Sequence, residues 1–266
     1  MTTTTENFET LALEHGDDLA IITLRRPERS NALGAQSGRD LRAVASICAT
    51  DSGVRAVLLR SEGRNFCVGG DLAEFAASSD LGSAVRAMTV DFHAAIASFA
   101  RMRAPLVMAV QGAAAGAGLS LVGIADLTVA GRSASFTAAY TGVGFSADGG
   151  MTWTLPRLIG LRRYQELVFT NRTVKADEAQ TLGLVTEVVD DEQLATRSEA
   201  LARQLAQGPT SAYGAVRRLV LESSQRALEP QLDQESLEIS ALAAGADAQA
   251  AIQAALQRQR PRFTGQ

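Results

Sequence analysis

Alternation between short apolar runs and longer helix-like stretches is the feature that most constrains the fold of this 266-residue chain. The runs have strand length, and the stretches between them carry apolar residues at helical spacing. Chains that alternate in this way form layered α/β folds, in which helices cover a sheet. The sequence therefore predicts an α/β fold over roughly residues 8–190. We expect strands at 19–24, 56–60, 106–110, 127–130 and 184–189, and helices at 37–50, 81–102, 161–170 and 191–207.

The chain changes character at the Gly-Pro pair 208–209, which breaks a helix. From there to residue 259 the sequence is almost free of strand-like patterns and rich in alanine, leucine and glutamine. We therefore expect an α/β core over residues 1–207 and a helical C-terminal region over 208–266. This region has more apolar residues than a short hairpin of helices can bury, which predicts packing on another subunit.

Charge and composition argue against several classes of partner. A formal net charge of −4 gives no basic field to attract nucleic acid. No apolar run reaches membrane-spanning length, and residues 1–6 lack the parts of a signal peptide, so we expect a short frayed leader. Cys48 and Cys67 are too few for a disulfide framework and lack metal-site spacing, which indicates reduced thiols in a cytoplasmic protein without a metal.

Two glycine-rich segments, 66–71 and 111–118, each follow a predicted strand and precede a helix-like stretch. Either segment alone could be an ordinary turn, with Asp71 as a helix N-cap, or a place of close helix–strand packing. Glycine and alanine also leave backbone N–H groups unobstructed, and such groups at a helix start attract a negative oxygen. The N–H groups of Gly70 and Ala117 are therefore candidates for an oxyanion hole, which stabilises an enolate-like or tetrahedral oxyanion.

Five sequence elements follow one another along the chain. They lie at 26–33 (RPxxxNAL), 66–72 (FCxGxDL), 109–118 (AVNGxAxGxG), 181–185 (xxGLV) and 262–266 (RFTGK-like). In this order they resemble the crotonase superfamily, the enoyl-CoA hydratases and isomerases, over nearly the whole chain. The resemblance implies a ββα spiral core with a helical C-terminal trimerisation region, in trimers or dimers of trimers. It also implies an acyl-CoA thioester as substrate, with coenzyme A as part of that substrate and no separate cofactor.

The resemblance assigns catalytic roles to several positions. In the family two backbone N–H groups hold the thioester carbonyl, and the matching residues are Gly70 and Ala117. The hydratases also use two glutamates, but the matching residues here are Ser120 and Tyr140. Neither a serine nor a tyrosine hydroxyl is a general base near neutral pH, so ordinary hydration is not expected.

The same resemblance assigns substrate binding to other residues. The coenzyme A tail is expected at Arg29 and at the backbone of Asp71 and Leu72, and Tyr140 is included among the substrate-binding residues. Phe263 is expected to reach an adenine pocket in this or an adjacent subunit. Without the resemblance, Arg29 and its neighbours read equally well as solvated surface charges.

Asp148 is the candidate for proton transfer. By itself, an aspartate before two glycines reads as a turn residue or an N-cap. Residues 144–160, apart from Ala147 and Met151, resemble the segment of crotonase isomerases, including the phenylacetate-pathway ring isomerase, whose aspartate moves the proton. One carboxylate beside two N–H donors can remove a proton next to a thioester carbonyl and return it along the allyl system. We therefore predict an enoyl-CoA isomerase.

Two alternatives remain open. The aromatic-CoA dehalogenases of the same superfamily use a histidine at the position of His93 as base and an aspartate at the position of Asp148 as nucleophile. Those enzymes have a tryptophan where this chain has Tyr140, and a lone histidine is more often structural. The other alternative is an acyl-CoA binder that has lost the hydratase glutamates and has no activity.

Overall fold

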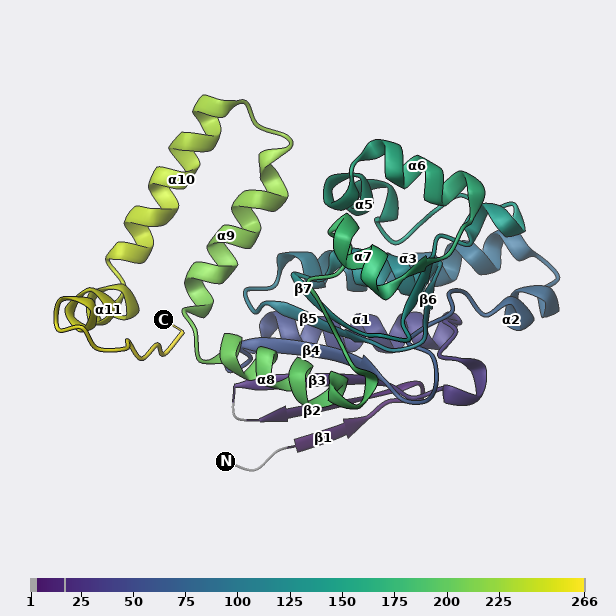
Figure 1. The fold of residues 1–266 in the computed structure, drawn as a ribbon, viewed down its shortest axis with the longest axis horizontal. Helices are drawn as coiled ribbons and strands as arrows, with labels where there is room; N and C mark the ends of the chain where they lie inside the picture. Colours follow the sequence, from purple (N-terminus) through teal and green to yellow (C-terminus); the bar gives the residue numbers. More distant parts are fainter. Residues whose placement is uncertain (1–3, 17, 266) are drawn as a thin grey trace.

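A computed structural model describes residues 4–16 and 18–265 and has an α/β body with a group of helices beside it (Figure 1). Seven strands of this part of the chain form one sheet, in the order β1-β2-β3-β4-β5-β7-β10. The strands from β3 to β10 are parallel, and β1 and β2 pair antiparallel at one edge. Their bounds are β1 (Thr4–Asn7), β2 (Leu11–Gly16), β3 (Leu19–Leu24), β4 (Ala56–Ser61), β5 (Leu106–Val110), β7 (Leu127–Gly131) and β10 (Glu187–Val189).

Four of the five predicted strands are confirmed as β3, β4, β5 and β7, and the fifth is the shorter β10. The expectation of a frayed leader is wrong for residues 4–7, which pair with β2 in a register that sets Thr4 opposite His15. Residues 1–3 lie outside the described part of the chain. The sequence pattern does not predict β2, because the second half of this strand is polar and lacks apolar alternation.

The central strands are buried on both faces because helices cover the sheet from two sides. Successive residues of β3 point to opposite faces, so Ile21 and Ile22 enter different apolar clusters. Ile21 joins the cluster formed with α8 (Leu194–Ala206). Ile22 joins the larger cluster, which includes α1 (Ala35–Thr50) and α3 (Leu81–Arg101).

A second, smaller sheet and several short helices lie between β5 and α8 in the chain. The sheet consists of β6 (Ala113–Ala115), β8 (Ser135–Thr137) and β9 (Val174–Lys175). The helices of this part and of the preceding loops are α2 (Leu72–Ala77), α4 (Ala117–Ile124), the 3-10 helix η2 (Tyr140–Val143), α5 (Met151–Ile159), α6 (Leu161–Thr170) and α7 (Ala176–Leu182). The four predicted helices correspond to α1, α3, α6 and α8, the last preceded by the 3-10 helix η3 (Asp191–Gln193).

The helical C-terminal region is confirmed as α9 (Thr210–Ser223), α10 (Leu228–Ala243) and α11 (Ala246–Leu256), which stand to one side of the α/β body (Figure 1). Arg217 ties α9 to the body, because its guanidinium donates to the carbonyl groups of Phe99 and Ala104 and pairs with Asp126. These bonds satisfy carbonyl groups at and beyond the end of α3 that have no partner within the helix.

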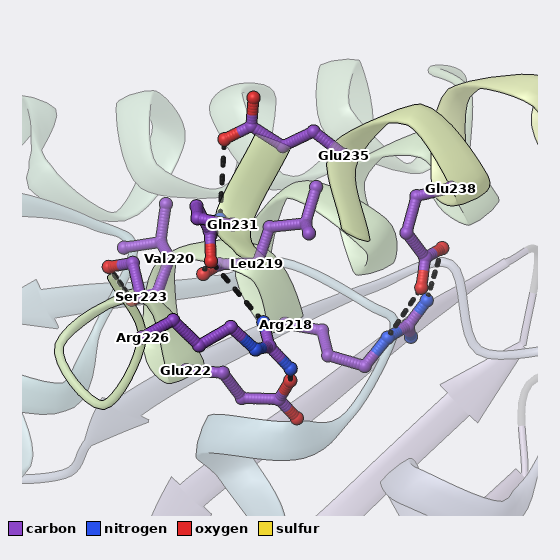
Figure 2. A network of polar contacts seen from close by, with 9 residues as sticks. All are labelled: Arg218, Leu219, Val220, Glu222, Ser223, Arg226, Gln231, Glu235 and Glu238. Atoms are coloured by element: carbon purple, nitrogen blue, oxygen red, sulfur yellow. Dashed lines mark hydrogen bonds and ion pairs between the residues drawn. The ribbon is translucent and has the colours of Figure 1, made fainter. Parts of the chain in front are cut away.

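Polar contacts join α9 to α10 (Figure 2). Arg218 donates two hydrogen bonds to the Glu238 carboxylate, over 3.2 and 2.7 Å, and Gln231 accepts from Arg226. α10 has no buried residue in the described chain, and Leu237 and Ile239 of α10 are exposed. None of the described helices is both long and apolar enough to cross a membrane.

Candidate active site

A cavity of about 1050 Å³ opens among the glycine-rich turns, helix α3 and the loop before α5. Its lining is mostly apolar, with Val68, Leu72, Phe75, Val85, Met88, Val143 and Phe145 as its apolar side chains other than alanine. Among the described residues of the lining, the side chains that can exchange a proton are His93, Tyr140 and Asp148. An apolar cavity with a few convergent polar groups is the usual form of a small-molecule site.

The first glycine-rich turn leaves one backbone donor free. The Leu33 N–H donates to the Gly69 carbonyl over 2.7 Å, and the Asp71 N–H donates to the Leu33 carbonyl over 3.0 Å. Between them, the Gly70 N–H has no acceptor within the described chain. A Cβ atom at position 70 would lie 2.7 Å from Cε2 of Phe75, so this position requires glycine.

The second glycine-rich turn packs directly on the first. The Cys67 N–H donates to the Ala113 carbonyl over 3.1 Å, and the Ala115 N–H donates to the Cys67 carbonyl over 2.9 Å. A Cβ atom at Gly118 would lie 2.2 Å from the Cys67 carbonyl oxygen, so this close approach of two backbones requires glycine. Ala117 begins α4, and none of the described residues accepts a hydrogen bond from its N–H.

Gly70 and Ala117 therefore bring two available N–H groups to the same cavity. Helix α4 adds the positive end of its dipole at the second of them. Two such donors on one side of an apolar cavity can bind a carbonyl oxygen and stabilise the negative charge that it acquires in a reaction. The oxyanion-hole function of these residues stays a prediction.

Asp148 lines the cavity from the loop before α5. The Met151 N–H donates to the Asp148 carbonyl over 3.1 Å, which closes a turn. Gly149 and Gly150 inside this turn have φ angles of 59° and 81°, a region that suits glycine. The N-cap of α5 is Gly150, so the alternative in which the Asp148 side chain caps this helix is wrong.

Side chains from three other elements contact Asp148, two of them at its carboxylate and one at its backbone carbonyl. Tyr140 of η2 donates its hydroxyl proton to Oδ1, because a carboxylate can only accept. The Ser120 hydroxyl, on α4, lies 2.9 Å from the Asp148 carbonyl oxygen and 3.1 Å from the Tyr140 hydroxyl. His93 of α3 approaches from the other side, with Nε2 3.5 Å from Oδ2. The carboxylate is 20% exposed, so it can still meet a ligand in the cavity.

His93 is bound through the atom that faces Asp148. The Gly149 N–H donates to Nε2 over 3.1 Å, so Nε2 carries its lone pair and the proton of a neutral ring is on Nδ1. The His93 side chain is 51% exposed, so its ring reaches water as well as the cavity. In this arrangement His93 orients the loop after Asp148.

Tyr140 stays protonated in this environment. Burial raises the pKa of its hydroxyl, and the negative charge of Asp148 and the hydrogen bond to it raise that pKa further. Tyr140 therefore acts as a hydrogen-bond donor to Asp148 near neutral pH.

Two of the predicted substrate-binding residues, Leu72 and Tyr140, line the cavity, whereas Asp71 is used elsewhere. The Asp71 carboxylate accepts the Glu74 N–H over 3.2 Å as the N-cap of α2 and pairs with Arg26 over 3.1 Å. Burial acts to raise the pKa of Asp71, but these hydrogen bonds and the Arg26 charge prevail and lower it below its ordinary value. Asp71 thus fixes the start of α2. Its N–H donates to the Leu33 carbonyl and its carbonyl accepts the Phe75 N–H, each over 3.0 Å, so the binding of a ligand by the Asp71 backbone stays a prediction.

Arg29 and Phe263 lie outside the described lining of the cavity. Arg29 is exposed at the end of the 3-10 helix η1 (Pro27–Arg29). Phe263 is half-buried in the C-terminal tail, where Asp247 accepts the Thr264 N–H over 2.7 Å. The binding of a coenzyme A tail by Arg29 and Phe263 stays a prediction.

Sequence reasoning named His93 but missed Val85, Met88 and Thr89, which α3 presents to the same cavity. Val85 lies three and four residues before Met88 and Thr89, and Thr89 lies four residues before His93. This spacing is the signal of one helix face, and it could have identified the four residues together. Phe75 and Phe145, whose ring centroids lie 6.4 Å apart, come from separate loops, and no spacing relates them.

Comparison with known proteins identifies the family. The model of the enoyl-CoA hydratase/isomerase family matches residues 14–266. The chain belongs to this family. The crystal structure of an enoyl-CoA hydratase/isomerase from Cupriavidus metallidurans has a TM-score of 0.89 at 30% identity and covers 98% of both chains, which agrees with the predicted crotonase fold. Members of the family act on acyl-CoA thioesters.

The individual relatives differ in their reactions. A Rhodobacter capsulatus protein named "Probable enoyl-CoA hydratase" is 35% identical over 97% of this chain and 99% of its own length. The 1,2-epoxyphenylacetyl-CoA isomerase of Escherichia coli is 33% identical over 92% of this chain and 94% of its own. The 4-chlorobenzoyl coenzyme A dehalogenase-2 of an Arthrobacter species is 35% identical over 82% of this chain and 80% of its own length. The relatives therefore agree on the family and differ in the reaction, which depends on the residues of the site.

Proposed function

We propose that this enoyl-CoA hydratase/isomerase family member is an isomerase that moves a carbon–carbon double bond in an enoyl-CoA. The observation that carries the proposal is a single carboxylate, Asp148, on the same apolar cavity as the free N–H groups of Gly70 and Ala117. Ser120 and Tyr140 stand where family hydratases have their two glutamates, and neither hydroxyl can activate water near neutral pH.

The mechanism needs three groups of the chain. The thioester oxygen accepts hydrogen bonds from the N–H groups of Gly70 and Ala117, which makes the neighbouring C–H acidic. Asp148 takes that proton, and the electron pair of the broken C–H bond delocalises into the enolate. The Asp148 carboxylic acid then returns the same proton to the far carbon of the allyl system. The double bond moves, the carboxylate is restored, and coenzyme A takes part only as a portion of the substrate.

The apolar lining supports this chemistry because it excludes water from the enolate. Phe75, Met88 and Phe145 surround the space next to the reacting groups. Electrostatic interactions are stronger where water is excluded, and the enolate is less exposed to proton exchange with solvent.

The first test is the conversion of 3-enoyl-CoA to the conjugated 2-enoyl isomer, followed by ultraviolet absorbance, with hydration of 2-enoyl-CoA measured alongside. We expect isomerisation without appreciable hydration, and a loss of about 10²- to 10⁴-fold in kcat for Asp148→Asn, because this change removes the base. Asp177→Asn, at a carboxylate that is 76% exposed, is the matched control and should leave the rate unchanged. Absence of isomerisation over several chain lengths, or activity that survives Asp148→Asn, overturns the proposal.

A second candidate is hydrolytic dehalogenation of an aryl-CoA, as in the named activity of the Arthrobacter relative. It is favoured by one observation, the 3.5 Å between His93 Nε2 and Asp148 Oδ2. Asp148 would attack the ring carbon and expel halide, and water deprotonated by His93 would cleave the aryl ester. The Gly149 N–H occupies the Nε2 lone pair that this role requires, which is why we place it second. Halide release from 4-halobenzoyl-CoA that His93→Ala abolishes would favour this candidate.

We also propose that the chain assembles with copies of itself, as trimers or dimers of trimers. Large apolar side chains of the C-terminal helices are exposed in a single chain. They are Val216, Val220, Leu228, Leu232, Leu237, Ile239, Ile252 and Leu256. Light scattering should give a mass near three or six times that of the 28.0 kDa chain, and a mass of one chain would exclude the assembly. The two free, buried cysteines support the expectation of a cytoplasmic location.

A further inference from the structure

We propose that Tyr140 is a positioning residue that holds Asp148 by Oδ1, so that Oδ2 is the oxygen that carries the proton during isomerisation. This inference rests on the proposed isomerase function. It concerns a residue that the family resemblance places at the position of a hydratase glutamate and among the substrate-binding residues, with no part in orienting Asp148.

The hydrogen bonds around Asp148 distinguish its two carboxylate oxygens. Oδ1 accepts the hydroxyl proton of Tyr140. Oδ2 has His93 Nε2 at 3.5 Å, but that nitrogen already accepts the Gly149 N–H and has no proton to give when the ring is neutral. Oδ2 therefore accepts no hydrogen bond from the described residues, which makes it the more available oxygen for a substrate proton.

Ser120 lies against Tyr140 and against the loop of Asp148. The Ser120 side chain is completely buried, and its hydroxyl lies 3.1 Å from the Tyr140 hydroxyl and 2.9 Å from the Asp148 carbonyl oxygen. Tyr140 has given its one proton to Oδ1, so Ser120 is the donor toward whichever of these two oxygens it bonds, and it has one proton to give. The loop that carries Asp148 and the side chain that orients it thus both contact the same serine on α4.

A held carboxylate matters because the same group must take and return one proton. If the carboxyl group turns about its Cβ–Cγ bond, the proton that it carries can move away from the enolate and exchange with water. The Tyr140 hydrogen bond opposes that turn, because Oδ1 still accepts the Tyr140 hydroxyl proton when Oδ2 carries the substrate proton. The expected consequence is direct return of the substrate's own proton to the product.

The test compares Tyr140→Phe with Tyr164→Phe, which makes the same change on α6 outside the described lining of the cavity. We expect kcat of Tyr140→Phe to fall by about 10- to 100-fold with KM within about twofold, because the lost bond acts on the base. Ser120→Ala should give a smaller loss of kcat, and Tyr164→Phe none.

A label distinguishes positioning from a loss of folded protein. With 3-enoyl-CoA deuterated at the carbon next to the carbonyl, wild type should deliver part of the deuterium to the far carbon of the product. Tyr140→Phe should deliver less and incorporate more hydrogen from water. Unfolded molecules make no product, so instability alone leaves the isotope content of the product unchanged. An unchanged isotope content, or a kcat equal to that of Tyr164→Phe, overturns the proposal.

A further measurement does not depend on turnover. The protein has three tyrosines, and their ionisation is followed by ultraviolet absorbance, with Tyr140→Phe to identify one contribution. Asp148→Asn should let Tyr140 ionise at lower pH than in wild type, because the Asp148 charge helps to raise the pKa of this tyrosine. An unchanged titration would refute the contact itself. Activity that survives Asp148→Asn would refute the isomerase mechanism, so the two failures are distinguishable.

Discussion

Substitution of Gly149 by alanine should destabilise the protein more than the same substitution at Gly144. Both glycines have positive φ, at 59° and 77°, and both lie in the segment between η2 and α5. They differ in their surroundings. A Cβ atom at Gly149 would lie 2.6 Å from Cε1 of Phe92 and 2.8 Å from Cβ of Ser120, whereas one at Gly144 would have nothing within 4 Å.

The magnitude follows from two separate costs. An L-residue at positive φ costs about 1–2 kcal/mol relative to glycine, and this cost applies to both variants. Overpacking adds about 1–3 kcal/mol to Gly149→Ala alone, because Phe92 is completely buried and cannot move into solvent. We therefore expect a loss of about 1–2 kcal/mol for Gly144→Ala and about 2–5 kcal/mol for Gly149→Ala in the free energy of unfolding.

Thermal unfolding at one protein concentration measures the difference. In a chain of this size 1 kcal/mol shifts Tm by about 2–4 °C, so Gly149→Ala should unfold roughly 2–12 °C below Gly144→Ala. Equal Tm values for the two variants would show that Phe92 and Ser120 make room at no cost. That result would refute the reasoning that a rigid apolar wall fixes the loop next to Asp148.

Two further predictions concern the glycine-rich turns. Ala117→Pro removes the N–H of Ala117 at the first position of α4, where proline suits a helix. We expect kcat of Ala117→Pro to fall by about 10²- to 10³-fold. The control, Ala176→Pro at the start of α7, should leave kcat unchanged. Equal kcat values for Ala117→Pro and wild type would exclude an oxyanion role for the Ala117 N–H. The pKa of Asp71 lies below its ordinary value in the folded protein, because its hydrogen bonds and the Arg26 charge outweigh burial. Ionised Asp71 therefore stabilises the fold above its unfolded pKa, and this stability is lost as the pH falls through the folded pKa. The free energy of unfolding should therefore fall less between about pH 6 and pH 3 in Asp71→Asn than in wild type, and equal slopes would contradict this.

The parts of the fold that the sequence predicts are those with a repeating apolar pattern. Strands β3, β4, β5 and β7 are mostly apolar and largely buried on both faces, so the pattern finds them within a residue or so. Strands β6, β8 and β9 have two or three residues each, which is too short for any period to be detected. β1 is exposed throughout, and its pairing with β2 is decided by the partner strand.

The candidate site also has residues that the sequence predicts and contacts that it does not. Gly70 and Ala117 were predicted because each belongs to a local turn whose glycines have a physical reason that is visible in the sequence. The contacts of Asp148 could not be predicted, because they join residues that are far apart or out of any period. His93 and Gly149 are 56 residues apart, and Ser120 and Asp148 are 28 apart. Only the packing of α3 and α4 beside the loop brings these groups together.

The contact between Tyr140 and Asp148 gives a physical reason why the hydratase glutamates are absent. A glutamate at the position of Tyr140 would set a second carboxylate against Asp148, in a cavity with an apolar lining. Two carboxylates in contact repel each other, and one of them would hold a proton near neutral pH. A neutral hydroxyl instead donates to Asp148 and leaves it free to take a proton from the substrate. The water-activating glutamate pair and a single proton-transferring aspartate are therefore alternative solutions in this cavity, and the proposed isomerase mechanism assigns the second to this chain.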